Sequence, residues 1–364
     1  MSEHSFLQPN IQIGDRQIGP GHSPFIIAEL SGNHQGSLEQ ALALIDAAAD
    51  AGADAIKIQT YTADTITMQH DGPEFRIEGG LWAGRTLYDL YQEAHTPWDW
   101  HPALFAKAKS RGILLFSSPF DSTAIELLQS LDSPAYKIAS FEINDIGLIQ
   151  QAARTGKPLI ISTGLATLAE IEEAVIAVRQ AGGRQLALLH CISGYPTPIE
   201  DCNLATLTDL AHRFQIPIGL SDHTIDHTAS VTAVALGATI IEKHFTLDRQ
   251  DGSVDAAFSL EPAEFAAMVQ QIRRAHQAVG KVNYDLKPSE TGGRAFRRSL
   301  YVTADIAAGQ TFTTANVRSI RPGLGLHTRY LPQILGSTAK VDIAKGTALA
   351  EHHLVFDLPN RKPK

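Results

Sequence analysis

The stretch from Pro217 to Phe245, PIGLSDHTIDHTASVTAVALGATIIEKHF, decides the fold. It holds two short apolar runs that close on a histidine, His223 in the first and His244 in the second. The segment between them, from Thr228, has apolar residues at helical spacing and ends in glycine. Strand, helix and strand in this order predict a βαβ unit with two parallel strands.

The same alternation of apolar runs and amphipathic segments continues through most of the chain. Length, β-branched content and flanking turn residues separate expected strands from expected helices. Eight strands are expected, beginning at Phe25 (FIIAEL), Ala55 (AIKIQ), Ile113 (ILLFSS), Ala135 (AYKIAS), Pro158 (PLIIST), Leu186 (LALLHC), Pro217 (PIGLSD) and Thr239 (TIIEKHF). Eight such units predict an α/β fold, a (β/α)8 TIM barrel. The alternative, an open doubly wound sheet, needs a phosphate loop after the first strand, and ELSGNHQGS has its glycines at the wrong spacing.

Changes of pattern along the chain mark the expected domains. Residues 1–24 are expected to form an N-terminal segment that caps the barrel, and residues 25–280 the barrel itself. Residues 281–294 lose periodicity and gain proline and glycine, which is typical of a linker. Residues 295–364 combine short strand-like runs with turn residues and predict a small β-rich module.

The connection after the second expected strand, residues 60–96, is far longer than an ordinary loop. This connection and the residues just after it are rich in aromatics, in the run GLWAGRTLYDLYQEAHTPWDWH from Gly80. We expect it to cover a site.

Composition excludes several classes of partner. The 364 residues carry a formal net charge of −9 with scattered Lys and Arg, so no basic block is present to bind nucleic acid. No apolar segment approaches the roughly 20 residues that span a bilayer, and the start, MSEHSFLQPN, has no basic region followed by an apolar stretch. Two cysteines make no disulfide framework, so a cytoplasmic protein without a membrane partner is expected.

Polar residues gather where the expected strands end. In a TIM barrel, catalysis takes place at the carboxyl ends of the strands, and a purely structural barrel does not need charges there. The candidates are Glu29, Lys57, Gln59, Ser117, Ser118, Lys137, Ser140, Glu142, Ser162, Thr163, His190, Ser221, Asp222, His223, Glu242, Lys243 and His244.

The two histidines of the opening stretch form the first candidate site. They lie 244 − 223 = 21 residues apart, one βαβ step, which places them on adjacent strands where two imidazoles can share a divalent metal. The alternative is that each bonds the backbone at its strand end. Asp255, in the loop DRQDGSVDAAFS, either supplies a carboxylate to the metal or to a substrate hydroxyl, or forms a turn.

Lys57 and Lys137 interrupt apolar strands, where an ammonium group is costly unless it meets anions at the barrel mouth. They predict an acidic substrate with a carboxylate or phosphate. Ser118 and other strand-end hydroxyls either donate to that anion or merely end strands. A Schiff-base lysine is the rival interpretation, weakened by the second lysine, by Glu29 and by the expected metal.

Several motifs in this order resemble the sialic acid synthase family, whose members condense phosphoenolpyruvate with an N-acetylated sugar. The motifs are IAEL and GNHQGS, IKIQT, SSPFD, YKIAS, ISTG, YPTP, GLSDHT and EKHFTLD. The resemblance runs from Phe25 to the C-terminal module, which is similar to the antifreeze-like (SAF) domain of the family. It implies a TIM barrel followed by a SAF domain.

The resemblance also implies roles for individual residues. His223 and His244 match the metal ligands, and a divalent ion is implied, with Mn²⁺ expected and Mg²⁺ or Co²⁺ as alternatives. The phosphoenolpyruvate positions are matched by Lys57, Lys137, Ser140, Ser162 and Ser221, with Ser118 beside them. The positions that face the amino sugar or assist proton transfer are matched by Glu29, Gln59, Glu142, Tyr195 and Asp255. Arg321 matches an arginine that reaches the neighbouring barrel in a domain-swapped homodimer.

One departure concerns the acceptor sugar. Where the N-acetylneuraminate enzymes have an asparagine shortly before YPTP, this chain reads CISGY from Cys191 to Tyr195, so the sugar pocket is expected to differ. N-acetylneuraminate and legionaminate remain alternative products of the condensation. Trp82, Trp98 and Trp100 either pack the long connection or line an apolar patch against the sugar, and packing is expected for at least two. A non-catalytic barrel that serves its C-terminal module is a further rival, which the retained histidines and lysines speak against.

Overall fold

A computed structural model describes residues 7–359, so the first six residues of the expected N-terminal segment and the last five of the C-terminal module lie outside it. The chain divides into two compact units, the first ending at Gly280 and the second beginning at Lys281. Each unit has its own hydrophobic core.

The first unit is a closed barrel of parallel strands in the order β10-β3-β4-β5-β6-β7-β8-β9. The strands are β3 (Phe25–Glu29), β4 (Ala55–Thr60), β5 (Leu114–Pro119), β6 (Tyr136–Ile138), β7 (Leu159–Ser162), β8 (Leu186–Cys191), β9 (Ile218–Asp222) and β10 (Ile240–His244). These are the eight runs expected from sequence, and the predicted TIM barrel is confirmed.

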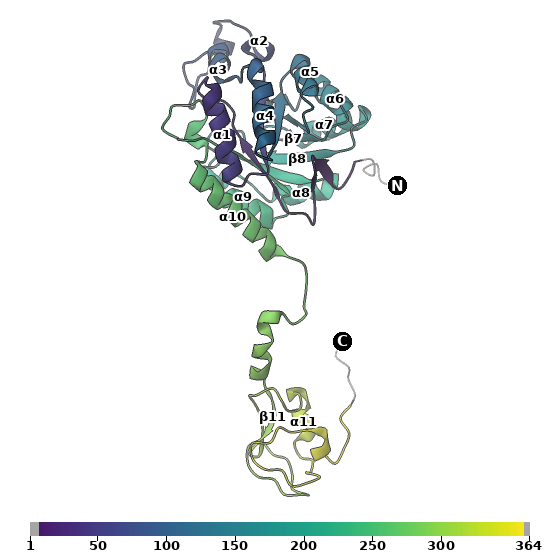
Figure 1. The fold of residues 1–364 in the computed structure, drawn as a ribbon. Coiled ribbons are helices and arrows are strands. Elements are labelled where there is room, and N and C mark those ends of the chain that lie inside the picture. Colours follow the sequence, from purple (N-terminus) through teal and green to yellow (C-terminus); the bar gives the residue numbers. More distant parts are fainter. Residues whose placement is uncertain (1–6, 360–364) are drawn as a thin grey trace. The chain divides into compact units, whose positions relative to one another are not determined.

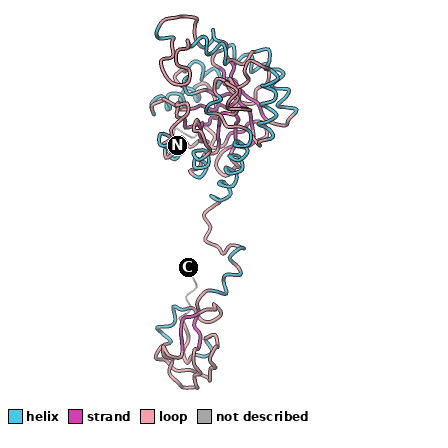
Figure 2. The backbone as a smooth tube through the Cα atoms, turned by 90° about the vertical axis from the view of Figure 1, so that its left-hand side faces the viewer, coloured by secondary structure: helices cyan, strands magenta, loops and turns pink. Residues whose placement is uncertain are grey.

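Helices surround the barrel strands (Figures 1 and 2). They are α1 (Leu38–Asp50), α4 (His101–Ser110), α5 (Ser122–Ser130), α6 (Ile146–Arg154), α7 (Leu168–Gln180), α8 (Thr206–Phe214), α9 (Thr228–Ala235) and α10 (Pro262–Val279). Local signals fix their starts: the Asp121 carboxylate accepts from two amides of α5, and Thr167 with Glu170 forms a capping box at α7. Gly237, at φ 100°, turns the chain after α9 into β10.

Alternate residues of each strand face two different cores. In β3, Ile26 and Ala28 pack against the helices, whereas Phe25 and Ile27 pack inside the barrel. Both faces are apolar below the mouth, which is why these strands have continuous apolar runs in the sequence.

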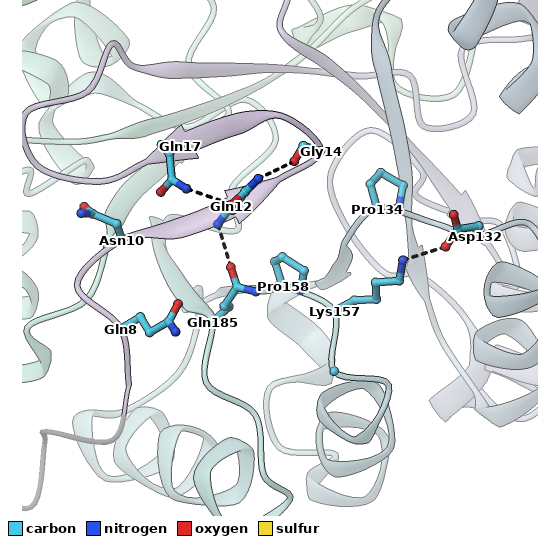
Figure 3. A pocket seen from close by; sticks show the side chains of 11 residues that line it. Gln8, Asn10, Gln12, Gly14, Gln17, Asp132, Pro134, Lys157, Pro158 and Gln185 are labelled. Carbon is cyan, nitrogen blue, oxygen red and sulfur yellow. Dashed lines mark hydrogen bonds and ion pairs between the residues drawn. The ribbon is translucent and has the colours of Figure 1, made fainter.

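An N-terminal hairpin closes the amino end of the barrel. Its strands, β1 (Ile11–Ile13) and β2 (Arg16–Ile18), pair antiparallel. Three buried isoleucines of the hairpin, Ile11, Ile13 and Ile18, belong to the same cluster as the inward side chains of the barrel strands. The hairpin therefore acts as an apolar plug, with polar residues around it (Figure 3).

The long connection after β4 has its own structure. It holds α2 (Ala63–Ile66), the 3-10 helix η2 (Pro73–Phe75), α3 (Leu87–Ala94) and η3 (Trp98–Trp100). A bridge between Arg76 and Thr86 pinches residues 76–86 into a hairpin-like loop.

The second unit contains β11 (Ser299–Val302) paired antiparallel with β12 (Val317–Ile320), and α11 (Leu331–Ile334). Its remaining pairing consists of isolated bridges such as Ile306 with Ile343. Leu300, Phe312 and Leu349 are fully buried in its core. Across residues 7–359, no helix combines the length and the apolar character needed to cross a membrane.

Candidate active site

A cavity of about 510 Å³ opens at the carboxyl ends of the barrel strands. Twelve of the fourteen residues predicted for the site line it: Glu29, Lys57, Gln59, Lys137, Ser140, Glu142, Ser162, Tyr195, Ser221, His223, His244 and Asp255. Ser118 lies just outside the lining and meets the Lys57 ammonium at 3.4 Å. Arg321 belongs to the second unit, where it directly follows β12.

Strand alternation explains why these side chains converge. In β4, Ile56 and Ile58 pack toward the helices, so Lys57 and Gln59 point into the barrel mouth. In the same way Ile241 of β10 faces the helices. The two-residue period then places Glu242 and His244 on the inner side of β10.

The floor of the cavity is a cluster of buried opposite charges. Lys57 Nζ lies 3.0 Å from Glu29 Oε2 and 3.3 Å from Glu242 Oε1, and Lys137 Nζ lies 3.8 Å from the same Glu242 oxygen. Ser221 Oγ donates to Glu242 Oε1 at 3.1 Å. All four charged side chains are at least 95% buried. A substrate anion entering here meets lysines that are already held in place.

Glu242 is a site residue to which the sequence analysis assigned no role. It appeared among the strand-end residues, two positions before His244, but a charge in an apolar run does not reveal its partners. In the structure one Glu242 oxygen touches both lysines and Ser221.

Burial and charge shift the protonation of these groups. Burial alone would lower the pKa of both lysines; for Lys57 the two carboxylates, Glu242 first, outweigh it and raise the pKa, whereas for Lys137 burial prevails and lowers it. Burial raises the pKa of Glu142 to about 7, against the opposing charge of Lys137. The Glu142 carboxyl therefore titrates near neutral pH; burial also raises the pKa of Glu29 and Asp255.

The two histidines lie side by side at the ends of β9 and β10, with ring centroids 5.2 Å apart. The Ile192 carbonyl lies 2.9 Å from Nδ1 of His223, which leaves Nε2 for another partner. Burial keeps the pKa of His244 well below its ordinary value, so its ring is neutral, the form that binds metals. Its buried Nδ1 has no hydrogen-bond partner among the described residues and lies 4.0 Å from Asp255 Oδ2.

This donor set fits a divalent ion held by two imidazoles, with further positions left for substrate or water. Residues 7–359 contain no group of three or more His, Cys, Asp and Glu side chains arranged to hold a metal. An ion held by the two histidines would therefore take its remaining ligands from substrate or water.

Asp255 does more than shape a turn. It is 8% exposed, lines the cavity, and its carboxylate accepts a hydrogen bond from Ser31 Oγ at the end of β3. Ser31 Oγ also accepts from Gln59 Nε2 at 3.2 Å, and Gln59 donates to Glu29 at 2.8 Å. A chain of polar contacts thus links Asp255, beside the histidines, to the lysine cluster. Ser31 had no signal of its own in the sequence.

The Asp222 side chain lies on the opposite face of β9 from the side chain of His223, which follows it. Its carboxylate lies 3.0 Å from Lys243 Nζ and accepts from Ser230 Oγ at 2.6 Å and from Thr224 N at 2.9 Å. Lys243 is fully buried and donates to the Thr224 and Asp226 carbonyls. This ion pair links β9 to β10 directly behind His223 and His244, and it shapes the loop that follows His223.

The long connection after β4 supplies another part of the cavity lining. The side chains from it that line the cavity are Tyr61, Ile66, Ile77, Trp82, Leu87, Leu90, Tyr91 and Ala94. Of the three tryptophans, Trp98 donates its N–H to the Tyr61 carbonyl at 3.2 Å and Trp100 packs against His34, whereas Trp82 lines the cavity.

The fold and the site define a class: TIM-barrel enzymes with a buried cluster of lysines and glutamates and a histidine pair at the carboxyl ends of the strands. Within it, the chain belongs to the NeuB family, whose model matches residues 44–284, and a SAF domain model matches residues 297–355. The resemblance inferred from the motifs is confirmed.

Relatives cover nearly the whole chain. A pseudaminic acid synthase of Campylobacter jejuni subsp. jejuni serotype O:23/36 is 49% identical over 327 residues, covering 90% of this chain and 95% of the relative. A pseudaminic acid synthase of Helicobacter pylori is 43% identical, covering 90% of this chain and 96% of the relative. The crystal structure of an N-acetylneuraminic acid synthetase from Leptospira borgpetersenii superposes with a TM-score of 0.71 at 34% identity, covering 78% of this chain and 94% of that one.

Proposed function

We propose that the chain is a pseudaminic acid synthase, which condenses phosphoenolpyruvate with 2,4-diacetamido-2,4,6-trideoxy-β-L-altropyranose to give pseudaminic acid and phosphate. The observation that carries the proposal is the joining, in one cavity, of two buried lysines with a histidine pair. The similarity to the two pseudaminic acid synthases favours this acceptor over those of N-acetylneuraminate and legionaminate synthesis.

Phosphoenolpyruvate binds on the charged floor. Lys57 and Lys137 neutralise its carboxylate and phosphate, and its oxygens compete with Glu242 for the two ammonium groups. Ser140, Ser162 and Ser221 add hydroxyl donors, and Ser118 supports Lys57 from outside the lining. Ser162 Oγ is buried without a partner among residues 7–359, so it is free to donate.

His223 and His244 would hold a divalent ion, with Mn²⁺ preferred and Mg²⁺ or Co²⁺ as alternatives, and a bound ion would supply Lewis-acid polarisation of the carbonyl oxygen of the open-chain acceptor. Burial favours the neutral ring of His244, and the Ile192 carbonyl orients the ring of His223. The polar chain from Asp255 through Ser31 to Gln59 and Glu29 positions the sugar hydroxyls.

The reaction forms one carbon–carbon bond and breaks one C–O bond. C3 of phosphoenolpyruvate attacks the aldehyde carbon of the sugar, and the aldehyde oxygen takes up a proton. Water adds to C2 of phosphoenolpyruvate and gives up a proton. Cleavage of the C2–O bond then releases phosphate and leaves the 2-keto acid. Glu142, whose pKa lies near neutral, and Glu29 line the cavity and are placed to move these protons. The Tyr195 ring packs against the His223 ring, with centroids 4.5 Å apart.

Substrate turnover tests the proposal directly. Phosphate release from phosphoenolpyruvate is measured with the altropyranose and with N-acetylmannosamine as acceptors, before and after treatment with EDTA. We expect turnover with the altropyranose, its loss on chelation and its return with Mn²⁺. Turnover with N-acetylmannosamine alone would overturn the acceptor, and activity that survives chelation together with borohydride trapping of substrate would indicate a Schiff-base aldolase.

The active form is a domain-swapped homodimer in which Arg321 of each chain reaches the barrel of its partner. A mixing experiment tests this arrangement. Lys137→Ala and Arg321→Ala are each expected to be inactive, but exchange of subunits creates sites with an intact barrel and an intact arginine. In a swapped dimer the mixture recovers about one quarter of wild-type activity. A mixture that stays inactive after confirmed subunit exchange rules the swap out.

A further inference from the structure

A buried asparagine outside the cavity lining contacts the segments that carry His244 and Asp255. Asn33 lies between β3 and α1, in the motif GNHQGS, and its side chain is fully buried. Its Nδ2 donates to the carbonyl of Phe245, the residue directly after His244, at 2.9 Å. The same Nδ2 donates to Ser259 Oγ at 2.9 Å, and Oδ1 accepts from Asp255 N at 3.3 Å. Asn33 therefore links the end of β10 to the loop that carries Asp255.

Both main-chain polar groups of Asp255 depend on this asparagine. The Asp255 N–H donates to Asn33 directly. The Asp255 carbonyl accepts from Ser259 Oγ at 2.7 Å, and that hydroxyl in turn accepts from Asn33. Buried main-chain groups need such partners, so these bonds fix the peptide units on both sides of Asp255. The carboxylate, which accepts from Ser31 in the cavity, is thereby held from behind.

The contacts of Asn33 require a carboxamide. The Phe245 carbonyl can only accept a hydrogen bond, whereas the Asp255 N–H can only donate one. The side chain between them must donate at one atom and accept at the other, which a carboxamide does. A carboxylate of the same shape lacks the donor, and an aliphatic side chain lacks both groups.

The segment that Asn33 holds packs directly against His244. It is the 3-10 helix η6 (Ala256–Phe258), with Asp255 before it and Ser259 after it. The Phe258 ring meets the His244 ring with centroids 4.8 Å apart, and Asp255 Oδ2 lies 4.0 Å from His244 Nδ1. A shift of this segment would move the Asp255 carboxylate relative to the imidazole.

We infer that Asn33 is a positioning residue, which fixes Asp255 beside the histidine pair and thereby controls binding of the acceptor sugar. The inference rests on the proposed function, in which Asp255 faces the sugar, and deepens it with a residue that does not line the cavity. The lysines that bind phosphoenolpyruvate are held by Glu29 and Glu242, so their geometry should persist when Asn33 is changed.

The first test separates the two substrates. In Asn33→Ala, kcat/KM for the acceptor should fall roughly 10- to 100-fold, because the carboxylate that positions the sugar is displaced. The KM for phosphoenolpyruvate should stay within about threefold of the wild type. Steady-state phosphate release at varied concentrations of each substrate measures both values. A similar rise of KM for both substrates would indicate a general structural role and overturn the inference.

A double-mutant cycle shows whether Asn33 acts through Asp255. Acceptor kcat/KM is measured for Asn33→Ala, Asp255→Ala and the double variant. If the inference holds, the double variant lies within about threefold of Asp255→Ala, because the group that Asn33 positions is already gone. Losses that multiply would mean that Asn33 acts elsewhere, which also overturns the inference.

A milder variant keeps the inference testable if Asn33→Ala does not fold. Ser259→Ala removes the hydrogen bond to the Asp255 carbonyl but keeps the bond between Asn33 and Asp255 N. It should lower acceptor kcat/KM by roughly 3- to 10-fold. Ile13→Ala, in the plug at the amino end of the barrel, is the control for lost stability and should leave both KM values unchanged. If Ser259→Ala must decide alone, unchanged acceptor kinetics overturn the inference.

The inference and the proposed function can fail separately. Turnover of N-acetylmannosamine alone contradicts the proposed acceptor, but the same cycle, run with that sugar, still decides the role of Asn33. Amide hydrogen exchange of residues 248–259 needs no substrate. Exchange in this segment should be faster in Asn33→Ala than in the wild type, because its main-chain anchors are lost. Unchanged exchange overturns the inference, whichever acceptor is used.

Discussion

The two ends of the barrel carry pockets of similar size, about 510 Å³ at the carboxyl ends of the strands and about 590 Å³ at the amino ends. Both volumes fall in the range of ligand sites. Size therefore does not tell which end is used, and the side chains must decide.

At the amino end several polar groups bond one another (Figure 3), whereas Asn10 Oδ1 is buried without a partner among residues 7–359. Gln12 accepts from Gln17 at 2.9 Å, donates to the Gly14 carbonyl at 3.1 Å, and its backbone N–H donates to Gln185 at 2.7 Å. The one ion pair of this pocket, Lys157 with Asp132 at 2.7 Å, is largely exposed. At the carboxyl end, by contrast, the charged groups are buried, and Ser162 Oγ and His244 Nδ1 have no partner among residues 7–359.

The comparison teaches that a functional site is identified by buried charges rather than by volume or by uncommitted polar atoms alone. Holding buried charges is costly, so they persist where a ligand uses them. The amino end instead serves stability, with the isoleucine plug beneath a polar rim. Variants at matched positions of the two ends can break or sharpen this contrast.

The largest difference is expected between two single variants, each of which loses one lysine, one at the carboxyl end of the barrel and one at the amino end. Lys137→Ala should lower kcat/KM for phosphoenolpyruvate roughly 1,000-fold, because a buried cation that faces the anion is lost. Lys157→Ala at the amino end should change it less than about twofold, because its ion pair is exposed. Steady-state phosphate release measures both, and a similar loss in the two variants would remove the distinction between the ends.

A second contrast concerns the ion pair behind the histidines. Lys243→Met should lower the free energy of unfolding by about 3 kcal/mol, because Asp222 is left as an unpaired buried charge. Urea denaturation measures this loss. Arg213→Met, which removes the exposed pair with Asp209, serves as the control and should cost less than about 1 kcal/mol. Equal stability of the two variants would mean that the buried pair does not hold β9 and β10 together.

The plug at the amino end should matter for stability and not for turnover. Ile13→Ala removes a fully buried side chain from the cluster inside the barrel and should lower the free energy of unfolding by about 2 kcal/mol. The kcat of the folded enzyme at low temperature should stay within about twofold of the wild type. A large fall in kcat would show that the two ends are coupled.

The smallest effect is on the pH profile. Because the pKa of Glu142 is raised to about 7 by burial, its carboxyl is protonated below that pH and becomes an anion, beside Lys137, above it. An added negative charge repels phosphoenolpyruvate, so kcat/KM should fall roughly tenfold between about pH 6.5 and about pH 8.

Glu142→Gln should remove this falling limb from the profile. Asp132→Asn at the amino end is the matched control: its hydrogen bond to Lys157 lowers the pKa of Asp132, so it does not titrate in this range. A wild-type profile that is flat across pH 7 would contradict the assignment to Glu142.

Much of this arrangement was predictable because it follows from local pattern. The apolar runs and helical segments of the stretch Pro217–Phe245, repeated along the chain, were enough for the barrel. Once the barrel is assumed, strand ends become a list of candidates, and the lysines and histidines on it do line one cavity. A parallel barrel brings all its strand ends to one face, so position along a strand carries three-dimensional information.

The remaining features depend on contacts between distant segments. Asp222 and His223 are adjacent in sequence, yet the strand turns one toward Lys243 and the other toward the cavity. Ser31 and Asp255 are 224 positions apart and meet only because β3 and β10 are neighbours in the closed barrel.

By itself the sequence determined the barrel, the residues at its mouth and the kinship with the sialic acid synthases, since all three are written in local periodicity and short motifs. Tertiary structure alone decided that Glu242 joins the two lysines and that Trp82, unlike Trp98 and Trp100, faces the cavity. The physical reason is that a motif specifies which group is present, whereas charge pairing, burial and the rest of the cavity lining depend on which other segments fold against it.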